Sequence, residues 1–142
     1  MRHQSSVDLD APADVVRPHV ADLSRYRAWM PLIHEVEPVD ESTWRVELRA
    51  KVGVFARSKR LTMRRTVATG DEIVFERHED DGRTHAAWVM KVRIAPRPGG
   101  CTVTIELTYG GNLWTAGVLD KILAHQVEVG RKNLAALVAH SG

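Results

Sequence analysis

The sequence predicts one α+β domain, in which a curved antiparallel sheet of about seven strands wraps around a long C-terminal helix. Two observations lead to this fold class. From Trp44 to Tyr109, apolar residues recur at every second position, which is the period of half-buried strands. Beyond Trp114 they recur at every third or fourth position and no proline follows, which indicates one long helix. Because a curved sheet closed by a single helix encloses a hollow, we expect an internal cavity.

The composition fits a single domain spanning residues 1–142. With 142 residues, of which 44% are hydrophobic, the chain can bury a core without disulfides or metals. Its single cysteine, Cys101, excludes an internal disulfide, and Met1–Ser6 has no apolar core typical of a secretion signal. No apolar run approaches the roughly 18 residues of a membrane span, so we expect a cytoplasmic protein. The low aromatic content, 6%, argues against nucleic-acid binding through base stacking.

The first quarter of the chain predicts a strand followed by helices. His3–Leu9 alternates as a short strand, and Asp10-Ala11-Pro12 is typical of a helix start. Pro18 should bend the helix that begins near Pro12, because proline removes one backbone hydrogen bond. A second short helical turn should end at Pro31. The strands that follow are predicted at Leu32–Val39, Trp44–Val52, Lys59–Val67, Ile73–His78, Thr84–Ile94 and Cys101–Tyr109.

The turns between these strands predict a register. Asp81-Gly82 is the dipeptide that a two-residue type I′ hairpin favours, and it would place Phe75 opposite Trp88. This register collects the large apolar side chains on one face, as a half-buried sheet requires. The same reasoning at the neighbouring turns predicts the pairs Val46 with Arg65, Arg65 with Phe75, and Trp88 with Leu107.

Two arginines interrupt the predicted inner face. A guanidinium is rarely buried without a partner, so Arg65 and Arg77 should either reach a solvated rim or meet oxygen atoms inside the cavity. Tyr109 falls in the same predicted row as Arg77. These three residues, Arg65, Arg77 and Tyr109, are therefore the candidates for a catalytic role.

The C-terminal helix carries a stripe that is not purely apolar. Gln126, Gly130 and Asn133 lie among its apolar positions, where a closely packed helix would carry leucine or isoleucine. Either Gly130 allows a close crossing and the two amides bind backbone groups, or the stripe lines a cavity with polar points. The predicted ligand-binding residues are Val46, Arg65, Phe75, Arg77, Trp88, Met90, Ile105, Leu107, Tyr109, Ile122, Gln126, Val129, Gly130 and Asn133.

One stretch of the predicted sheet is strongly basic. Between Arg45 and Arg65 there are eight basic residues and one acid, Glu47. We interpret this stretch as a solvated outer face with cross-strand ion pairs. The alternative is a weak contact with anionic membranes through basic residues at four positions, namely Arg49, Lys51, Arg57 and Arg60.

Signatures of metals and cofactors are weak. The seven histidines show no His-x-His or His-x-x-x-His spacing, and a single cysteine cannot form a ligand pair. Gly110-Gly111 lacks the lysine and hydroxyl residue of a phosphate-binding loop. We therefore predict no metal and no cofactor.

Several motifs resemble the START-like helix-grip superfamily, also called SRPBCC, over the whole chain. They are Ala11-Pro12-Ala13-Asp14-Val15-Val16, the segment from Asp22 to Pro31, and the order of strand, short helices, six strands and helix. Ala50-Lys51-Val52-Gly53-Val54-Phe55 and Tyr109-Gly110-Gly111 are similar to two branches: polyketide cyclase/dehydrase and lipid transport, and the G-type subunit of carbon monoxide dehydrogenase. The resemblance implies a helix-grip fold whose cavity holds a lipid, sterol, polyketide or quinone-like molecule.

Three functions are compatible with these residues. Binding of a hydrophobic small molecule, by a monomer or homodimer, requires only the apolar wall. A polyketide aromatase/cyclase would use Arg65 and Arg77 to stabilise an enolate and Tyr109 as proton donor, but the predicted inner rows contain no Asp, Glu or His as base. An accessory, membrane-recruited subunit of an oxidoreductase is the third, implied by the likeness to carbon monoxide dehydrogenase. We place binding first.

Overall fold

The computed structural model describes residues 2–52, 55–110 and 116–139, and places seven strands in one antiparallel sheet. The strands are β1 (Arg2–Leu9), β2 (Ile33–Pro38), β3 (Thr43–Val52), β4 (Phe55–Ala68), β5 (Glu72–Arg77), β6 (Trp88–Arg97) and β7 (Gly100–Tyr109). Their order in the sheet is β1-β7-β6-β5-β4-β3-β2. The described helical segments are α1 (Ala13–Ala21), the 3₁₀ helix η1 (Leu23–Ala28) and α2 (Ala116–Ala139).

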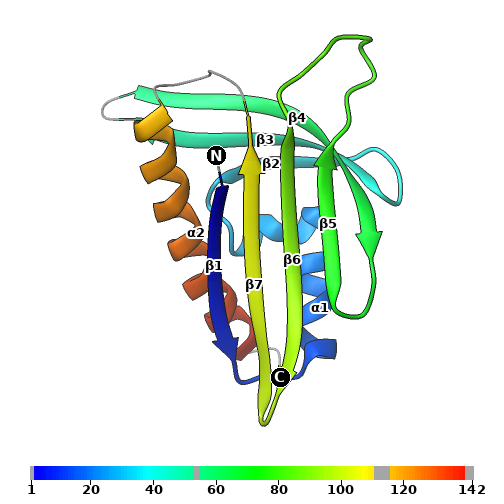
Figure 1. Ribbon diagram of the computed structural model, residues 1–142, viewed down its shortest axis with the longest axis vertical. Coiled ribbons are helices and arrows are strands. Elements are labelled where there is room, and N and C mark those ends of the chain that lie inside the picture. The colour runs from blue at the N-terminus through cyan, green and yellow to red at the C-terminus, as the bar shows by residue number, and fades with distance from the viewer. Residues whose placement is uncertain (1, 53–54, 111–115, 140–142) are drawn as a thin grey trace.

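The sheet curls, and the helices lie on its concave side (Figure 1). Helix α2 contacts β1 and β3, whereas α1 contacts β6 and η1 contacts β2. Strands β2, β3 and β4 cross over the ends of the other strands at the top of the view. This architecture confirms the predicted α+β helix-grip fold, with Pro18 inside α1 as expected.

The predicted faces are right, but three of the predicted pairings are wrong. Strand β4 begins at Phe55 and not at Lys59, so the hairpin with β3 is tighter and Val46 pairs with Leu61 instead of Arg65. Arg65 pairs with Phe75, as predicted. Because the β3–β4 register moves by an even number of residues, the inner face keeps its side chains.

Residues 78–87 do not form the predicted two-residue hairpin. The backbone N–H of His78 donates to the carbonyl of Thr62, and the N–H of Thr62 donates to the Glu79 carboxylate at 2.6 Å. These bonds direct the chain toward β4 instead of into a tight turn, and β6 begins only at Trp88. Phe75 therefore pairs with Met90 and not with Trp88.

The β6–β7 turn is also tighter than predicted. Arg97 pairs with Gly100 around a two-residue turn of Pro98 and Gly99, and Gly99 has the positive φ of 81° that glycine tolerates. As a result, Trp88 pairs with Tyr109 and not with Leu107. Gly100 is also constrained, because a Cβ there would overlap the Leu9 carbonyl.

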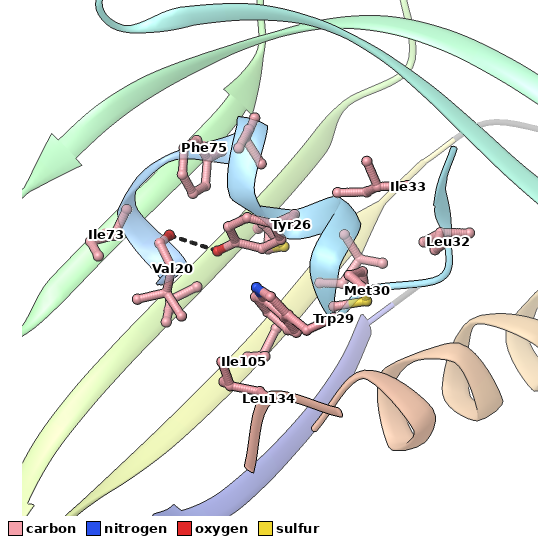
Figure 2. Close-up of a cluster of buried hydrophobic side chains, with 14 of the residues drawn as sticks. Val20, Tyr26, Trp29, Met30, Leu32, Ile33, Ile73, Phe75, Ile105 and Leu134 are labelled. Atoms are coloured by element: carbon pink, nitrogen blue, oxygen red, sulfur yellow. Dashed lines mark hydrogen bonds between the residues drawn. The ribbon is translucent and has the colours of Figure 1, made fainter. Parts of the chain in front are cut away.

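An aromatic cluster fills one end of the concave side (Figure 2). The Tyr26 hydroxyl donates to the Val20 carbonyl at 2.7 Å, and Trp29 Nε1 donates to the His19 carbonyl at 3.1 Å. Burial raises the pKa of Tyr26, which keeps the hydroxyl protonated as a donor. These bonds fix η1 to α1, and the Tyr26 ring packs against Phe75 of the sheet.

Helix α2 buries one stripe of residues, which includes Gly130 but neither Gln126 nor Asn133 of the predicted stripe. The buried residues are spaced three or four apart: Leu123, Val127, Gly130, Leu134 and Val138. Val129 is half-buried and Asn133 is exposed at the edge of this stripe. Val127 and Val138 were not predicted.

Candidate functional site

A small cavity lies between the sheet, η1 and α2 on the concave side. Its volume is about 50 Å³. The residues that line it come from η1, the segment before β2, five of the strands and α2, and all of them are apolar: Leu23, Met30, Leu32, Ile33, Val46, Leu48, Leu61, Met63, Trp88, Met90, Ile105, Leu107 and Val127. The wall therefore suits an apolar group.

Five of the predicted ligand-binding residues line this cavity: Val46, Trp88, Met90, Ile105 and Leu107. The sequence pattern did not reveal Met30, Leu32 and Ile33, because they belong to an irregular segment without a clear period. Leu61 was missed because the predicted register placed Arg65 beside Val46.

Two predicted aromatic residues lie beside the cavity and not in its lining. Phe75 is buried in the aromatic cluster, 5.9 Å from the Tyr26 ring and 5.7 Å from the Trp44 ring. Tyr109 is buried and stacks on Trp88, with ring centroids 5.2 Å apart. Tyr109 therefore supports one lining residue, Trp88.

Arg65 binds backbone carbonyls. Its guanidinium donates to the Ala21 carbonyl at 2.6 Å and to the Glu41 carbonyl at 3.4 Å, and lies over the Trp44 ring. The residue is half-buried and is absent from the cavity lining. These contacts connect β4 to the end of α1 and to the β2–β3 loop.

Arg77 belongs to a polar network at the end of β5. Its side chain is 9% exposed and donates to the Ala86 carbonyl and to Nδ1 of His85, both at 3.2 Å. Because His85 Nδ1 accepts this bond, its other nitrogen carries the proton and donates to the Asp81 carboxylate at 2.8 Å. Glu79 lies 3.7 Å from the guanidinium.

The charges of this network act on Lys59, the inner-face residue paired with Leu48. Burial and the positive charge of Arg77 lower the pKa of Lys59, and Glu79 offsets part of that effect. No acid or histidine was predicted beside Arg77, because the wrong hairpin put Glu79 and His85 elsewhere. None of these polar residues lines the cavity.

Four of the five candidates on α2 divide into two groups, whereas the half-buried Val129 lines neither hollow. Gly130 packs against Met30, and Asn133 Nδ2 donates to the Trp29 carbonyl at 3.1 Å, which are the contacts of a close helix crossing. Ile122 and Gln126 instead line a second, open cleft. Gln126 Oε1 is buried there and has no hydrogen-bond partner among the described residues.

This basic cleft lies between α2 and the β2–β3 edge of the sheet. Its volume is about 620 Å³, and its lining contains no acid: Pro31, His34, Arg49, Ala50, Lys51, Lys121, Ile122, His125 and Gln126. Arg49 and Lys51 were predicted to take part in a membrane contact, and their proximity to the helix was not foreseen.

Part of the rest of the basic stretch is paired. Arg60 donates to the Glu47 carboxylate at 3.1 Å, and Arg64 lies opposite Glu76. The side chain of Arg57 lies outside the described part of the structure. The membrane contact stays a prediction, now with Arg49 and Lys51 as its main described residues.

Other kinds of site find no support in the described part of the chain. It contains no cluster of three histidine, cysteine or acidic residues that could hold a metal ion. Cys101 is buried, and burial raises the pKa of its thiol, which opposes a role as nucleophile. No described helix is long and apolar enough to cross a bilayer.

The curled seven-stranded sheet, the C-terminal helix and the apolar cavity between them define the START-like helix-grip class. Within this class the chain belongs to the family described as polyketide cyclase/dehydrase and lipid transport, whose model matches residues 2–142. The sequence matches no curated protein. The likeness to the G-type subunit of carbon monoxide dehydrogenase stays a prediction.

Solved structures show the same fold at low sequence identity. A conserved protein from Geobacillus kaustophilus has a TM-score of 0.78 at 13% identity, covering 99% of this chain and 97% of the other. A START superfamily protein from Mycobacterium smegmatis has a TM-score of 0.77 at 17% identity, with 98% and 97% covered. The Zhui aromatase/cyclase from Streptomyces has a TM-score of 0.67 at 15% identity, with 98% and 93% covered. At these identities the likeness establishes the fold alone.

Proposed function

We propose that this protein binds a hydrophobic small molecule in the cavity between the sheet and α2. The observation that carries the proposal is the cavity wall, to which thirteen apolar residues contribute and no polar residue does. Ligand sites are typically apolar hollows of this kind with a few polar groups at their margin. The family to which the chain belongs supports a lipid or polyketide as the ligand.

The size of the cavity requires that side chains move when the ligand enters. A drug-sized ligand needs roughly 300 to 1,000 Å³, whereas the cavity holds about 50 Å³. Three of the lining residues are methionines, Met30, Met63 and Met90, whose unbranched side chains change rotamer readily. We infer that these methionines open the cavity around the ligand.

An aromatase or cyclase reaction is the alternative, and the contacts favour it less. Arg65 and Arg77 donate to backbone carbonyls and to His85, and neither lines the cavity. Tyr109 lies behind Trp88. With no acid or base among the lining residues, the cavity favours binding over proton transfer.

The experiment is a calorimetric titration of the protein with n-octanol. Leu48→Phe should fill the cavity and weaken binding at least about tenfold, whereas Met90→Ala should enlarge it and preserve binding. Val39→Phe is the control, because Val39 is an exposed hydrophobic residue outside the lining set. If n-octanol does not bind, or if Leu48→Phe and Val39→Phe behave alike, the proposal is wrong.

A further inference from the structure

The basic cleft exists because the edge strand β2 covers only part of the neighbouring strand β3. β2 begins at Ile33, which pairs with Leu48, and the backbone N–H of Arg49 donates to the Leu32 carbonyl. Strand β3 continues to Val52, beyond the cover of β2. Residues 49–51 of β3 therefore line an open space together with residues 121, 122, 125 and 126 of α2.

Positive charges predominate among the residues that line this space. Arg49, Lys51 and Lys121 form no ion pair with any residue in the described ranges, and His34 and His125 add two further nitrogen-bearing rings. Glu47 lies 3.8 Å from His34 but already binds Arg60 at 3.1 Å. Three unpaired cations around one hollow create a positive potential that attracts an anion.

In three segments of the chain, residues that line the cleft are sequence neighbours of residues that line the apolar cavity. Pro31 of the cleft lies between Met30 and Leu32 of the cavity, and Gln126 of the cleft precedes Val127 of the cavity. On β3, Ala50 follows Leu48 by two residues. Because consecutive residues are close in space, the apolar lining and the basic lining meet at Pro31 and at Gln126.

Gln126 marks this boundary. Its Oε1 is buried without a described partner, although buried side-chain amides normally form hydrogen bonds. A side-chain amide can present either its oxygen or its NH₂ group after a half-turn. It can therefore bind a hydroxyl or an anionic oxygen of a bound molecule.

We propose that the ligand is an amphiphile with an anionic group, a carboxylate or phosphate, held in the cleft by Arg49, Lys51 and Lys121. Its apolar part occupies the cavity, so this inference rests on the proposed function. The cleft acts as the specificity-determining site, because the cavity itself offers no polar contact.

The test compares three probes that share an octyl chain: octanoate, n-octanol and octyltrimethylammonium. At about pH 7.5 octanoate is ionised, and it should bind at least about tenfold more tightly than n-octanol, with octyltrimethylammonium weakest. In the double variant Arg49→Gln/Lys121→Gln the preference for octanoate should fall at least about fivefold, while n-octanol binds within about twofold of wild type. Raising salt from about 20 to about 500 mM should shrink the preference in the wild type.

A matched control distinguishes the loss of charge in the cleft from the loss of net positive charge on the protein. Arg25→Gln/Lys132→Gln removes two exposed positive charges outside the cleft lining and should retain the preference. Equal loss in both double variants, or equal binding of octanoate and n-octanol by the wild type, overturns the inference and leaves the proposed function intact. If no probe binds, the proposed function fails as well.

A vesicle experiment distinguishes a free amphiphile from a bilayer as the source of the anionic group. Phosphatidylcholine vesicles with and without phosphatidylglycerol are sedimented with the wild type and with Arg49→Gln/Lys121→Gln. If this variant loses vesicle binding but keeps the preference for octanoate, the cleft is a membrane contact and the inference is wrong.

Discussion

Gly130 of α2 lies directly against Met30, and a Cβ at Gly130 would sit 3.0 Å from the Met30 sulfur. Met30 also lines the cavity, so the approach of α2 at Gly130 helps to set the cavity wall. The close crossing of α2 over Met30 thus explains why a glycine stands in the helix stripe at this position.

This contact predicts coupling between the two residues. Gly130→Ala improves helix propensity by about 1 kcal/mol, but in the wild type the added methyl group must displace Met30. In a Met30→Ala background the space is free, so Gly130→Ala should be more favourable by about 1 kcal/mol than in the wild type. Urea unfolding of the four proteins measures the coupling. Ala136→Gly, at an exposed helix position, should show the same cost in both backgrounds.

Arg65 is predicted to stabilise the fold without contributing to affinity. Arg65→Ala removes hydrogen bonds to the Ala21 and Glu41 carbonyls and the contact with Trp44, at a cost of about 2 kcal/mol. Affinity for n-octanol should change less than about twofold. Arg64→Ala, at the neighbouring exposed position, should cost well under about 1 kcal/mol. A marked loss of affinity in a folded Arg65→Ala protein would show that Arg65 acts in binding.

Glu79 is predicted to hold residues 78–87 against β4. Glu79→Gln replaces the charge-assisted bond from the Thr62 N–H with a weaker neutral one, at a cost of about 1 kcal/mol. Hydrogen exchange of the Thr62 amide should accelerate relative to the wild type. Asp80→Asn, an exposed neighbour, should leave this amide unchanged. Unaltered exchange in Glu79→Gln would contradict the assigned role of the carboxylate.

His19 is predicted to make stability fall in mild acid. Burial and the charge of Arg25 lower its pKa below the ordinary value of 6.5, so near that pH the folded state binds fewer protons than the unfolded state. Stability therefore decreases as the pH falls through 6.5 toward the lower folded-state pKa. In His19→Asn, thermal melts between about pH 7 and about pH 5 should show a shallower decrease. A steeper decrease would mean that the histidine gains a partner on folding.

The sheet faces could be predicted from the sequence because side chains alternate with a period of two. Moving the register by two residues, from Phe75–Trp88 to Phe75–Met90, leaves the same side chains on the inner face. The partners could not be predicted, because the Asp81-Gly82 signal is overridden by the bonds of His78 and Glu79 to Thr62.

The hydrogen-bond acceptors of Arg65 and the basic cleft could not be predicted from the sequence for a different reason. Arg65 was recognised as an anomaly on the inner face, but its acceptors, the Ala21 and Glu41 carbonyls, are backbone groups without a sequence signal. The basic cleft depends on where β2 begins relative to α2, and periodicity does not fix that position.

The most direct test of ligand binding is NMR of protein with ¹³C-labelled methionine methyl groups during a titration with n-octanol. Met30, Met63 and Met90 line the cavity, so their methyl resonances should shift in a saturable manner with a common dissociation constant. Leu48→Phe should abolish the shifts at the same n-octanol concentrations. Resonances of Met30, Met63 and Met90 that stay unchanged up to the solubility limit would contradict binding in the cavity.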